Sequence, residues 1–213
     1  KLLGFEPTYE VIERDETQVS SLISSKEFTG FNVTVPYKKT VAKLCDELSS
    51  AASATGSVNT VIIDESGRAY GDNTDVHGFG IMLKLAGIQV KDKTCLILGT
   101  GGAAYAIEYY LKLAGAAEIL FCSRKGPIDY SNFATKAKQT QVVINATPVG
   151  MYPKVDESPI DLCKLPKLEA AVDIVYNPAQ TRFLEQAEKL GLKKANGLSM
   201  LVAQAFLAER VFR

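Results

Sequence analysis

The chain has 213 residues, of which 46% are hydrophobic and 23% carry charges of balanced sign, as in an ordinary globular protein. Its formal net charge of zero argues against a nucleic-acid or anionic-membrane partner, because binding to either favours a basic surface. No apolar run reaches the roughly 20 residues that cross a bilayer, and the first residues lack the basic-then-apolar pattern of a secretory signal. We therefore expect a cytoplasmic protein.

The cysteines favour the same compartment. They are scattered, without a CxxC pair or a neighbouring histidine cluster: Cys45, Cys95, Cys122 and Cys163. We expect neither a disulfide nor a metal site, as in a protein of a reducing compartment.

The chain opens with short elements. Residues 1–4 have the pattern of a last helical turn closed by a glycine, so we expect the sequence to begin inside a domain. Alternating side chains predict a strand over 8–12, and apolar spacing predicts a helix around 19–23. A β-rich run predicts a second strand over 31–35.

The next segments predict more mixed α/β structure. Apolar residues at helical spacing indicate a helix over 37–48, directly after Pro36. Residues 57–63 and 68–71 flank a turn and predict a hairpin. A helix over 76–86, stopped by a glycine, follows.

From residue 94 onward strands and helices alternate regularly. Residues 94–98 form a continuously apolar run, typical of a parallel strand that is buried on both faces. Three further segments are predicted as strands: 118–123, 141–145 and 170–175. Amphipathic spacing predicts three helices among and after them: 106–114, 183–190 and 201–212. This alternation is typical of a doubly wound sheet.

The turn Gly99-Thr100-Gly101-Gly102-Ala103, with Ala104 after it, fits the G-x-G-x-x-G/A fingerprint. Such glycines let backbone N–H groups approach a pyrophosphate, and the positive end of the following helix stabilises that anion. A purely structural turn is the alternative. The strand before the turn and the helix after it favour a dinucleotide cofactor.

The end of the second strand indicates which dinucleotide binds. An NAD site normally has an acidic residue there to hold the ribose 2′-OH. This strand ends in Cys122-Ser123-Arg124-Lys125, without an acid. Ser123 can form a hydrogen bond and Arg124 can pair with a 2′-phosphate, so NADP is favoured over NAD. The alternative is a basic loop in solvent.

A hydride-transferring enzyme also needs a group that exchanges a proton with the substrate oxygen. We interpret the sole histidine, His77, as an ordinary polar helix residue. Pro36 suits the first position of a helix, which places Lys38 in the first turn, where the helix dipole disfavours an ammonium. Partial burial would lower its pKa further, as a general base requires. Asp75 could orient this lysine, although spacing alone favours a helix N-cap.

Seven motifs together resemble the shikimate dehydrogenase family, and they cover nearly the whole chain in the right order. They are Asn32-Val33-Thr34-Val35-Pro36-Tyr37-Lys38, Gly56-Ser57-Val58-Asn59-Thr60, Gly71-Asp72-Asn73-Thr74-Asp75, Gly99-Thr100-Gly101-Gly102-Ala103, Asn145-Ala146-Thr147-Pro148-Val149-Gly150-Met151, Asp173-Ile174-Val175-Tyr176-Asn177-Pro178 and Asn196-Gly197-Leu198-Ser199-Met200-Leu201-Val202-Ala203-Gln204.

The resemblance implies NADP-dependent interconversion of 3-dehydroshikimate and shikimate in aromatic amino-acid biosynthesis, with Lys38 and Asp75 as the catalytic pair. It implies further roles for three groups of residues. The substrate would be bound by Thr34, Asn59, Tyr176 and Gln204. The 2′-phosphate would be bound by Ser123, Arg124 and Lys125. The nicotinamide and its ribose would lie along Thr147, Val175, Gly197 and Met200.

Two departures from the family pattern stand out. The family carries a Ser-x-Ser-Pro motif near its N-terminus that binds the substrate carboxylate, and this sequence begins after it. We therefore expect an incomplete first domain and weakened substrate binding. The stretch 124–141 is short for the family, so we expect a strand–helix unit to be missing beside the adenosine.

These observations predict two α/β domains. Residues 1–76, completed by the C-terminal helix 197–213, would form the substrate-binding domain. Residues 90–195 would form a Rossmann-like, doubly wound NADP-binding domain, with a helical hinge over 77–89.

Two other functions remain open: a quinate/shikimate dehydrogenase that uses NAD, and a ligand sensor on the same fold without turnover. The missing acid at the second strand disfavours the first, and the retained Lys38 and Asp75 disfavour the second. We expect a small-molecule substrate as the partner and a monomer or homodimer.

Overall fold

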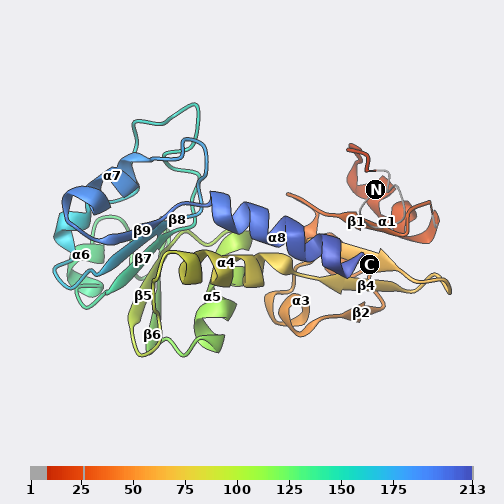
Figure 1. Cartoon of the computed structure of the whole chain (residues 1–213), viewed down its shortest axis with the longest axis horizontal. Coiled ribbons are helices and arrows are strands. Elements are labelled where there is room, and N and C mark those ends of the chain that lie inside the picture. The colour runs from red at the N-terminus through yellow and green to blue at the C-terminus, as the bar shows by residue number, and fades with distance from the viewer. Residues whose placement is uncertain (1–8, 26, 213) are drawn as a thin grey trace.

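Two sheets, each in its own α/β domain, organise the computed structural model, which describes residues 9–25 and 27–212 (Figure 1). The predicted fold class, an α/β substrate domain followed by a Rossmann-like domain, is confirmed. No helix in the described residues is both long and apolar enough to span a membrane.

The N-terminal domain contains a mixed four-stranded sheet of order β1-β3-β4-β2. Its strands are β1 (Gly30–Asn32), β2 (Glu47–Leu48), β3 (Thr60–Ile63) and β4 (Ala69–Asp72). The helices of this domain are α1 (Glu16–Ser25), α2 (Lys38–Ala42) and α3 (Ser50–Thr55). The predicted hairpin is confirmed, because β3 and β4 pair antiparallel. Val41, Val58 and Val61 are fully buried in the core beneath the helices.

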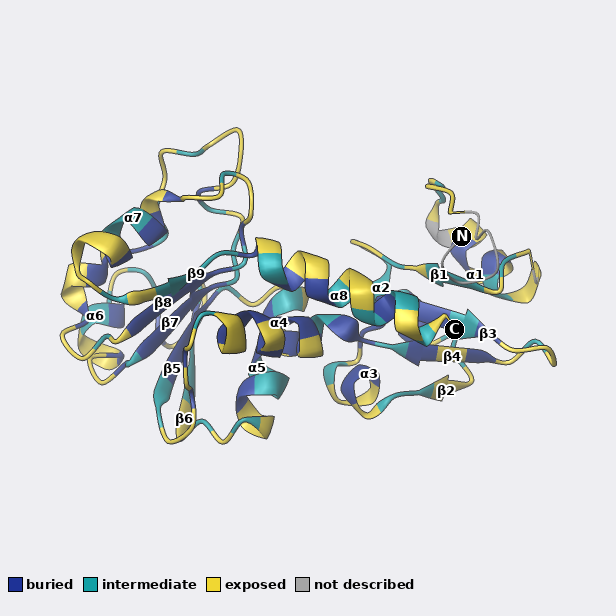
Figure 2. Cartoon of the chain, viewed as in Figure 1, coloured by how far each residue is buried: buried dark blue, intermediate teal, exposed yellow. Residues whose placement is uncertain are grey.

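The second domain contains a parallel five-stranded sheet of order β6-β5-β7-β8-β9. Its strands are β5 (Thr94–Leu98), β6 (Glu118–Cys122), β7 (Val142–Asn145), β8 (Ala170–Asp173) and β9 (Lys193–Ala195). The helical segments are α5 (Gly102–Leu113), α6 (Phe133–Lys136), the 3-10 turn η1 (Leu162–Lys164) and α7 (Arg182–Lys189). The central strands β5, β7 and β8 are buried on both faces, as the continuous apolar run of β5 predicts for that strand (Figure 2).

Two long helices join the domains. α4 (Thr74–Leu85) leads from the first sheet to the second, and α8 (Leu198–Val211) returns along it (Figure 1). The two helices approach closely: a Cβ added at Gly78 would lie 3.0 Å from the Met200 carbonyl oxygen. Because α4 and α8 both reach the region between the sheets, they carry side chains from either domain into one site.

Some predicted elements are wrong or shorter than expected. The helix over 37–48 ends at Ala42, because Glu47–Leu48 pairs with β4 as a parallel strand. That helix begins at Lys38, so Pro36 is not its first residue. Residues 9–12 form no strand, and β1 ends at Asn32. The expected helix end at residues 1–4 and the start of the 8–12 strand lie outside the described residues.

The outer edge of the parallel sheet agrees with the expectation of a missing unit. Among the described residues, the segment after β6 makes only a single bridge, between Cys122 and Ile128. The next helix, α6, has four residues. Among the described residues the sheet therefore ends at β6, and Arg124 and Lys125 directly after it are exposed.

Candidate active site

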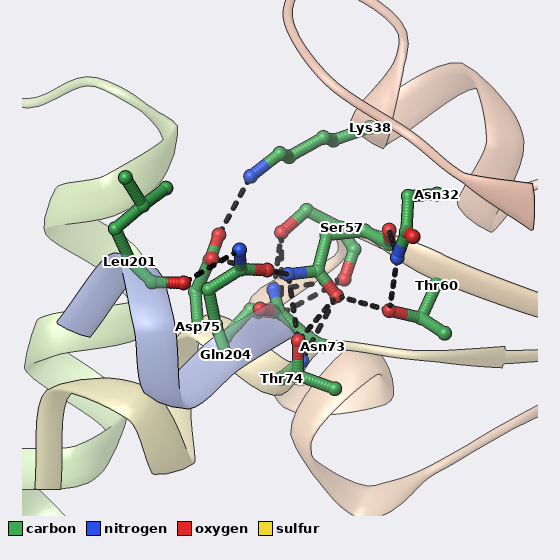
Figure 3. Close-up of polar contacts among 11 residues, drawn as sticks. Asn32, Lys38, Ser57, Thr60, Asn73, Thr74, Asp75, Leu201 and Gln204 are labelled. Atoms are coloured by element: carbon green, nitrogen blue, oxygen red, sulfur yellow. Dashed lines mark hydrogen bonds and ion pairs between the residues drawn. The ribbon is translucent and has the colours of Figure 1, made fainter. Parts of the chain in front are cut away.

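The catalytic pair predicted from the sequence meets between the two sheets. Lys38 is the first residue of α2 and Asp75 lies in the first turn of α4. The Lys38 Nζ donates to Asp75 Oδ2 at 2.6 Å, although the residues lie 37 positions apart in the chain (Figure 3). The side chains are 25% and 15% exposed, so both are shielded from solvent but remain reachable by a ligand. Asp75 is not the N-cap of its helix, because Asn73 occupies that position.

A buried amide orients the carboxylate. Asn59 Nδ2 donates to Asp75 Oδ1 and to Thr74 Oγ1, both at 3.0 Å. Asn59 Oδ1 accepts from the Thr74 backbone N–H at 2.9 Å and from Thr60 Oγ1 at 3.0 Å. Gln204 Oε1, from α8, lies 3.5 Å from the same Asn59 nitrogen. Asp75 therefore offers one oxygen to Lys38 while the other is fixed by the protein.

A cleft of about 1210 Å³ opens in front of this pair. Both domains line it, together with the N-terminal segment 9–14. The predicted site residues that line the cleft are Thr34, Lys38, Asn59, Asp75, Ala103, Tyr176, Gly197, Met200 and Gln204. The structure thus brings all of the predicted substrate and catalytic residues to one cavity.

The other predicted cofactor residues lie outside that cavity, at the carboxyl ends of the parallel strands. The glycine turn follows β5, Ser123-Arg124-Lys125 follows β6, Thr147 follows β7 and Val175 follows β8. Dinucleotides bind at this edge in open α/β sheets. The predicted cofactor residues therefore form a row that ends at the cleft, where Ala103 and Gly197 line it.

The glycine turn has the geometry of a phosphate cradle. Gly99 has φ +99°, a conformation that favours glycine, and a Cβ there would lie 2.9 Å from Thr147 Cγ2. A Cβ at Gly101 or at Gly102 would meet no atom within 4 Å, and both residues are exposed at the start of α5, which leaves room for a ligand beside their backbone. Arg124 and Lys125 are exposed at the rim and can bind a 2′-phosphate. These residues fit NADP.

Three further polar side chains lie on the elements around the site, and only His77 among them was considered from the sequence. Asn73, at the start of α4, donates to Ser57 Oγ at 2.8 Å, and both residues are buried. Lys39 is exposed, and its Nζ lies 5.2 Å from the centre of the Tyr105 ring on α5. His77 is exposed on α4. The cue available for Asn73 was its place in a dense polar run between two apolar segments.

A second unassigned pair lies at the ends of β7 and β8. Asn145 and Asp173 are fully buried, and burial raises the pKa of Asp173 to about 6. Each is a polar residue that closes an otherwise apolar strand, which is the signal that could have identified them.

Comparison with known proteins gives consistent matches. Residues 1–61 match the family model of the shikimate dehydrogenase substrate binding domain. The shikimate dehydrogenase (NADP(+)) of Clostridium beijerinckii is 35% identical, over 100% of this chain and 83% of that protein. A chorismate mutase/shikimate 5-dehydrogenase fusion protein from Clostridium acetobutylicum superposes with a TM-score of 0.91 at 36% identity, over 100% of this chain and 82% of the other. Shikimate 5-dehydrogenase from Thermus thermophilus, in complex with NADP(H) and shikimate, superposes with a TM-score of 0.86 at 35% identity, over 99% of this chain and 84% of the other. The chain belongs to the shikimate dehydrogenase family.

Proposed function

We propose that this protein is an NADP-dependent shikimate dehydrogenase, which reduces 3-dehydroshikimate to shikimate and catalyses the reverse reaction. The observation that carries the proposal is the Lys38–Asp75 contact of 2.6 Å in a cleft shared with the domain of the glycine turn. A proton-exchanging pair in a cleft that reaches the end of the glycine turn at Ala103 suits hydride transfer to a carbonyl.

Lys38 and Asp75 carry out the proton transfer that accompanies hydride transfer. In the reducing direction the Lys38 ammonium donates a proton to the substrate oxygen, and in the oxidising direction the amine accepts it. Asp75 stabilises the ammonium and holds it in place, since Asn59 fixes the far oxygen of the carboxylate. NADPH, when bound, supplies the hydride.

Polar side chains around the pair suit a polyhydroxylated acid. Thr34, Tyr176 and Gln204 line the cleft with Asn59 and offer hydroxyl and amide groups to the substrate hydroxyls and carboxylate. On the cofactor side, Ser123, Arg124 and Lys125 bind the 2′-phosphate. Thr147, Val175, Gly197 and Met200 lie along the nicotinamide end.

The domain boundaries remain part of the proposal. Residues 1–76 with the helix 197–213 form the substrate domain, residues 90–195 form the NADP domain, and residues 77–89 act as the hinge. The path of α4 and α8 between the two sheets supports this division. Closure about the hinge would exclude water from the reacting groups.

The test is shikimate oxidation assayed with NADP and with NAD, on the wild type, Lys38→Ala and Lys39→Ala. We expect preference for NADP and a rate loss of about 100- to 10,000-fold for Lys38→Ala, the usual contribution of a positioned acid–base group. Lys39→Ala removes the neighbouring exposed ammonium and should keep a rate close to that of the wild type.

Each alternative function has its own outcome. Equal rates with both cofactors would favour a quinate/shikimate dehydrogenase that uses NAD. Shikimate binding without any turnover would favour the sensor and refute the enzyme.

A further inference from the structure

A buried polar cluster with no assigned role adjoins the cofactor edge, where the central strands β7 and β8 end. Asn145 and Asp173 are the last residues of these strands and are partners in the ladder. Both are fully buried, and Asn145 Nδ2 donates to Asp173 Oδ1 at 3.0 Å. Neither side chain lines the catalytic cleft.

The Asp173 carboxylate joins three segments of the chain. Oδ1 accepts from Asn145 and from the backbone N–H of Val175, both at 3.0 Å. Oδ2 accepts from Thr181 Oγ1 at 2.6 Å. Thr181 is the N-cap of α7 and is itself fully buried. One carboxylate therefore holds together the end of β7, the turn after β8 and the start of α7.

The same hydrogen bonds extend to the residues proposed for the nicotinamide end. Asn145 Oδ1 accepts from the Thr147 backbone N–H at 3.0 Å and from Thr147 Oγ1 at 2.6 Å. The Val175 carbonyl accepts from the Gly197 N–H at 3.1 Å. The loops after β7, β8 and β9 are thus linked to Asp173 directly or through one further residue.

A packing role alone does not explain this carboxylate. Among the described residues, its partners are neutral donors, and no lysine or arginine pairs with it. Burying an unpaired carboxylate is costly, and its raised pKa reflects that cost. An apolar side chain would fill the same volume without the cost, but it would leave three buried donors without an acceptor.

We propose that Asp173 is a positioning residue for hydride transfer: its carboxylate sets the relative placement of the three loops that contact the nicotinamide end of the cofactor. This inference rests on the proposed function, because it takes NADP(H) as the ligand of these loops. Asp173 touches neither the cofactor nor the substrate in this arrangement, and acts through Asn145 and Val175.

The test is Asp173→Asn, which keeps the shape but turns one oxygen into an amide NH₂ that faces donors. Steady-state kcat and KM for NADPH are measured, together with direct binding of NADPH and of adenosine 2′,5′-bisphosphate, a fragment that lacks the nicotinamide. We expect kcat/KM for NADPH to fall at least about tenfold, since a 1 Å misplacement can cost about 100-fold. Fragment affinity should change less than about twofold, because the fragment binds at the glycine turn and the basic rim.

Controls separate positioning from folding. Asp156→Asn changes an exposed aspartate that pairs with Arg182 and should match the wild type. Thr181→Val should reproduce the selective loss in milder form, and Thr181→Ser should keep wild-type kinetics, since serine keeps the hydroxyl on Oδ2. If Asp173→Asn does not fold, the proposal is tested by comparing kcat/KM for NADPH between Thr181→Val and Thr181→Ser: a loss in the valine variant alone supports it, and equal values overturn it.

Unchanged NADPH kinetics and binding in folded Asp173→Asn would overturn the proposal, as would equal weakening of NADPH and the fragment. A wild type that binds NADPH without turnover would count against the proposed function alone. The ratio of NADPH to fragment affinity still tests Asp173 in that case.

Discussion

Gly197 is where the start of α8 presses against the second domain, and replacing it should damage both stability and activity. Its φ of −69° and ψ of −8° suit any residue, so backbone conformation does not require a glycine here. A Cβ at this position, however, would lie 1.9 Å from the Ile174 carbonyl oxygen and 2.5 Å from its carbon. The close approach of two backbones is therefore the reason for the glycine.

The structure sets the size of the effect of Gly197→Ala. The obstacle is backbone rather than a flexible side chain, so α8 and the loop after β8 must separate by roughly 1 Å, and overpacking of this kind costs about 1–3 kcal/mol. We expect a loss of about 2–3 kcal/mol in the free energy of unfolding. Since α8 carries Gln204 and Met200 into the cleft, a shift of roughly 1 Å should also lower kcat/KM by about 10- to 100-fold.

Urea denaturation followed by far-UV circular dichroism measures the first effect, since the chain has no tryptophan to report by fluorescence. NADPH absorbance in shikimate oxidation measures the second. Gly191→Ala is the matched control: Gly191 has φ +68° and no atom within 4 Å of an added Cβ. Gly191→Ala should lower the free energy of unfolding by about 1 kcal/mol through backbone strain alone and should leave the activity of the folded protein normal. If Gly197→Ala unfolds and turns over shikimate like the wild type, the close backbone contact between Gly197 and Ile174 is refuted.

Three further predictions concern single side chains. Arg124→Ala should raise KM for NADP at least about tenfold, because it removes a charge-assisted hydrogen bond to the 2′-phosphate, and should leave KM for NAD unchanged. Equal effects on both KM values would contradict the assignment of Arg124 to the 2′-phosphate. Burial raises the pKa of Asp173 from 3.8 to about 6, so folding takes up a proton between these values. The stabilising contribution of the protonated carboxyl is present below about pH 4 and is lost as the pH rises through 6. Over this range, urea titrations should show the unfolding free energy of the wild type falling by about 3 kcal/mol relative to that of Asp173→Asn. A difference that does not change with pH would refute this prediction. A thiol reagent should label exposed Cys163 in the native protein, which mass spectrometry would detect. Burial raises the pKa of Cys95 to about 12 and that of Cys122 to about 11, so both thiols should react only after unfolding.

Local patterns predicted the parallel domain well and the first domain poorly. β5, β7 and β8 are buried on both faces, so each is a continuous apolar run that can be recognised without knowing its neighbours. Residues 37–48 show the opposite case: their apolar spacing suits a helix, yet Glu47–Leu48 pairs with β4, which lies more than 20 residues further along the chain. Short strands depend on such partners more than on their own composition.

Residue types along the chain establish which functional groups are available: a glycine turn for a pyrophosphate, a basic strand end without an acid, a lysine and an aspartate. Which of these groups meet depends on how the two domains fold and pack. Lys38 and Asp75 come into contact because α2 and α4 both begin beside the same cleft. Asn145 and Asp173 become a buried pair because β7 and β8 lie in register. Residue type and periodicity report what a segment buries, whereas register and helix packing depend on contacts across the whole chain.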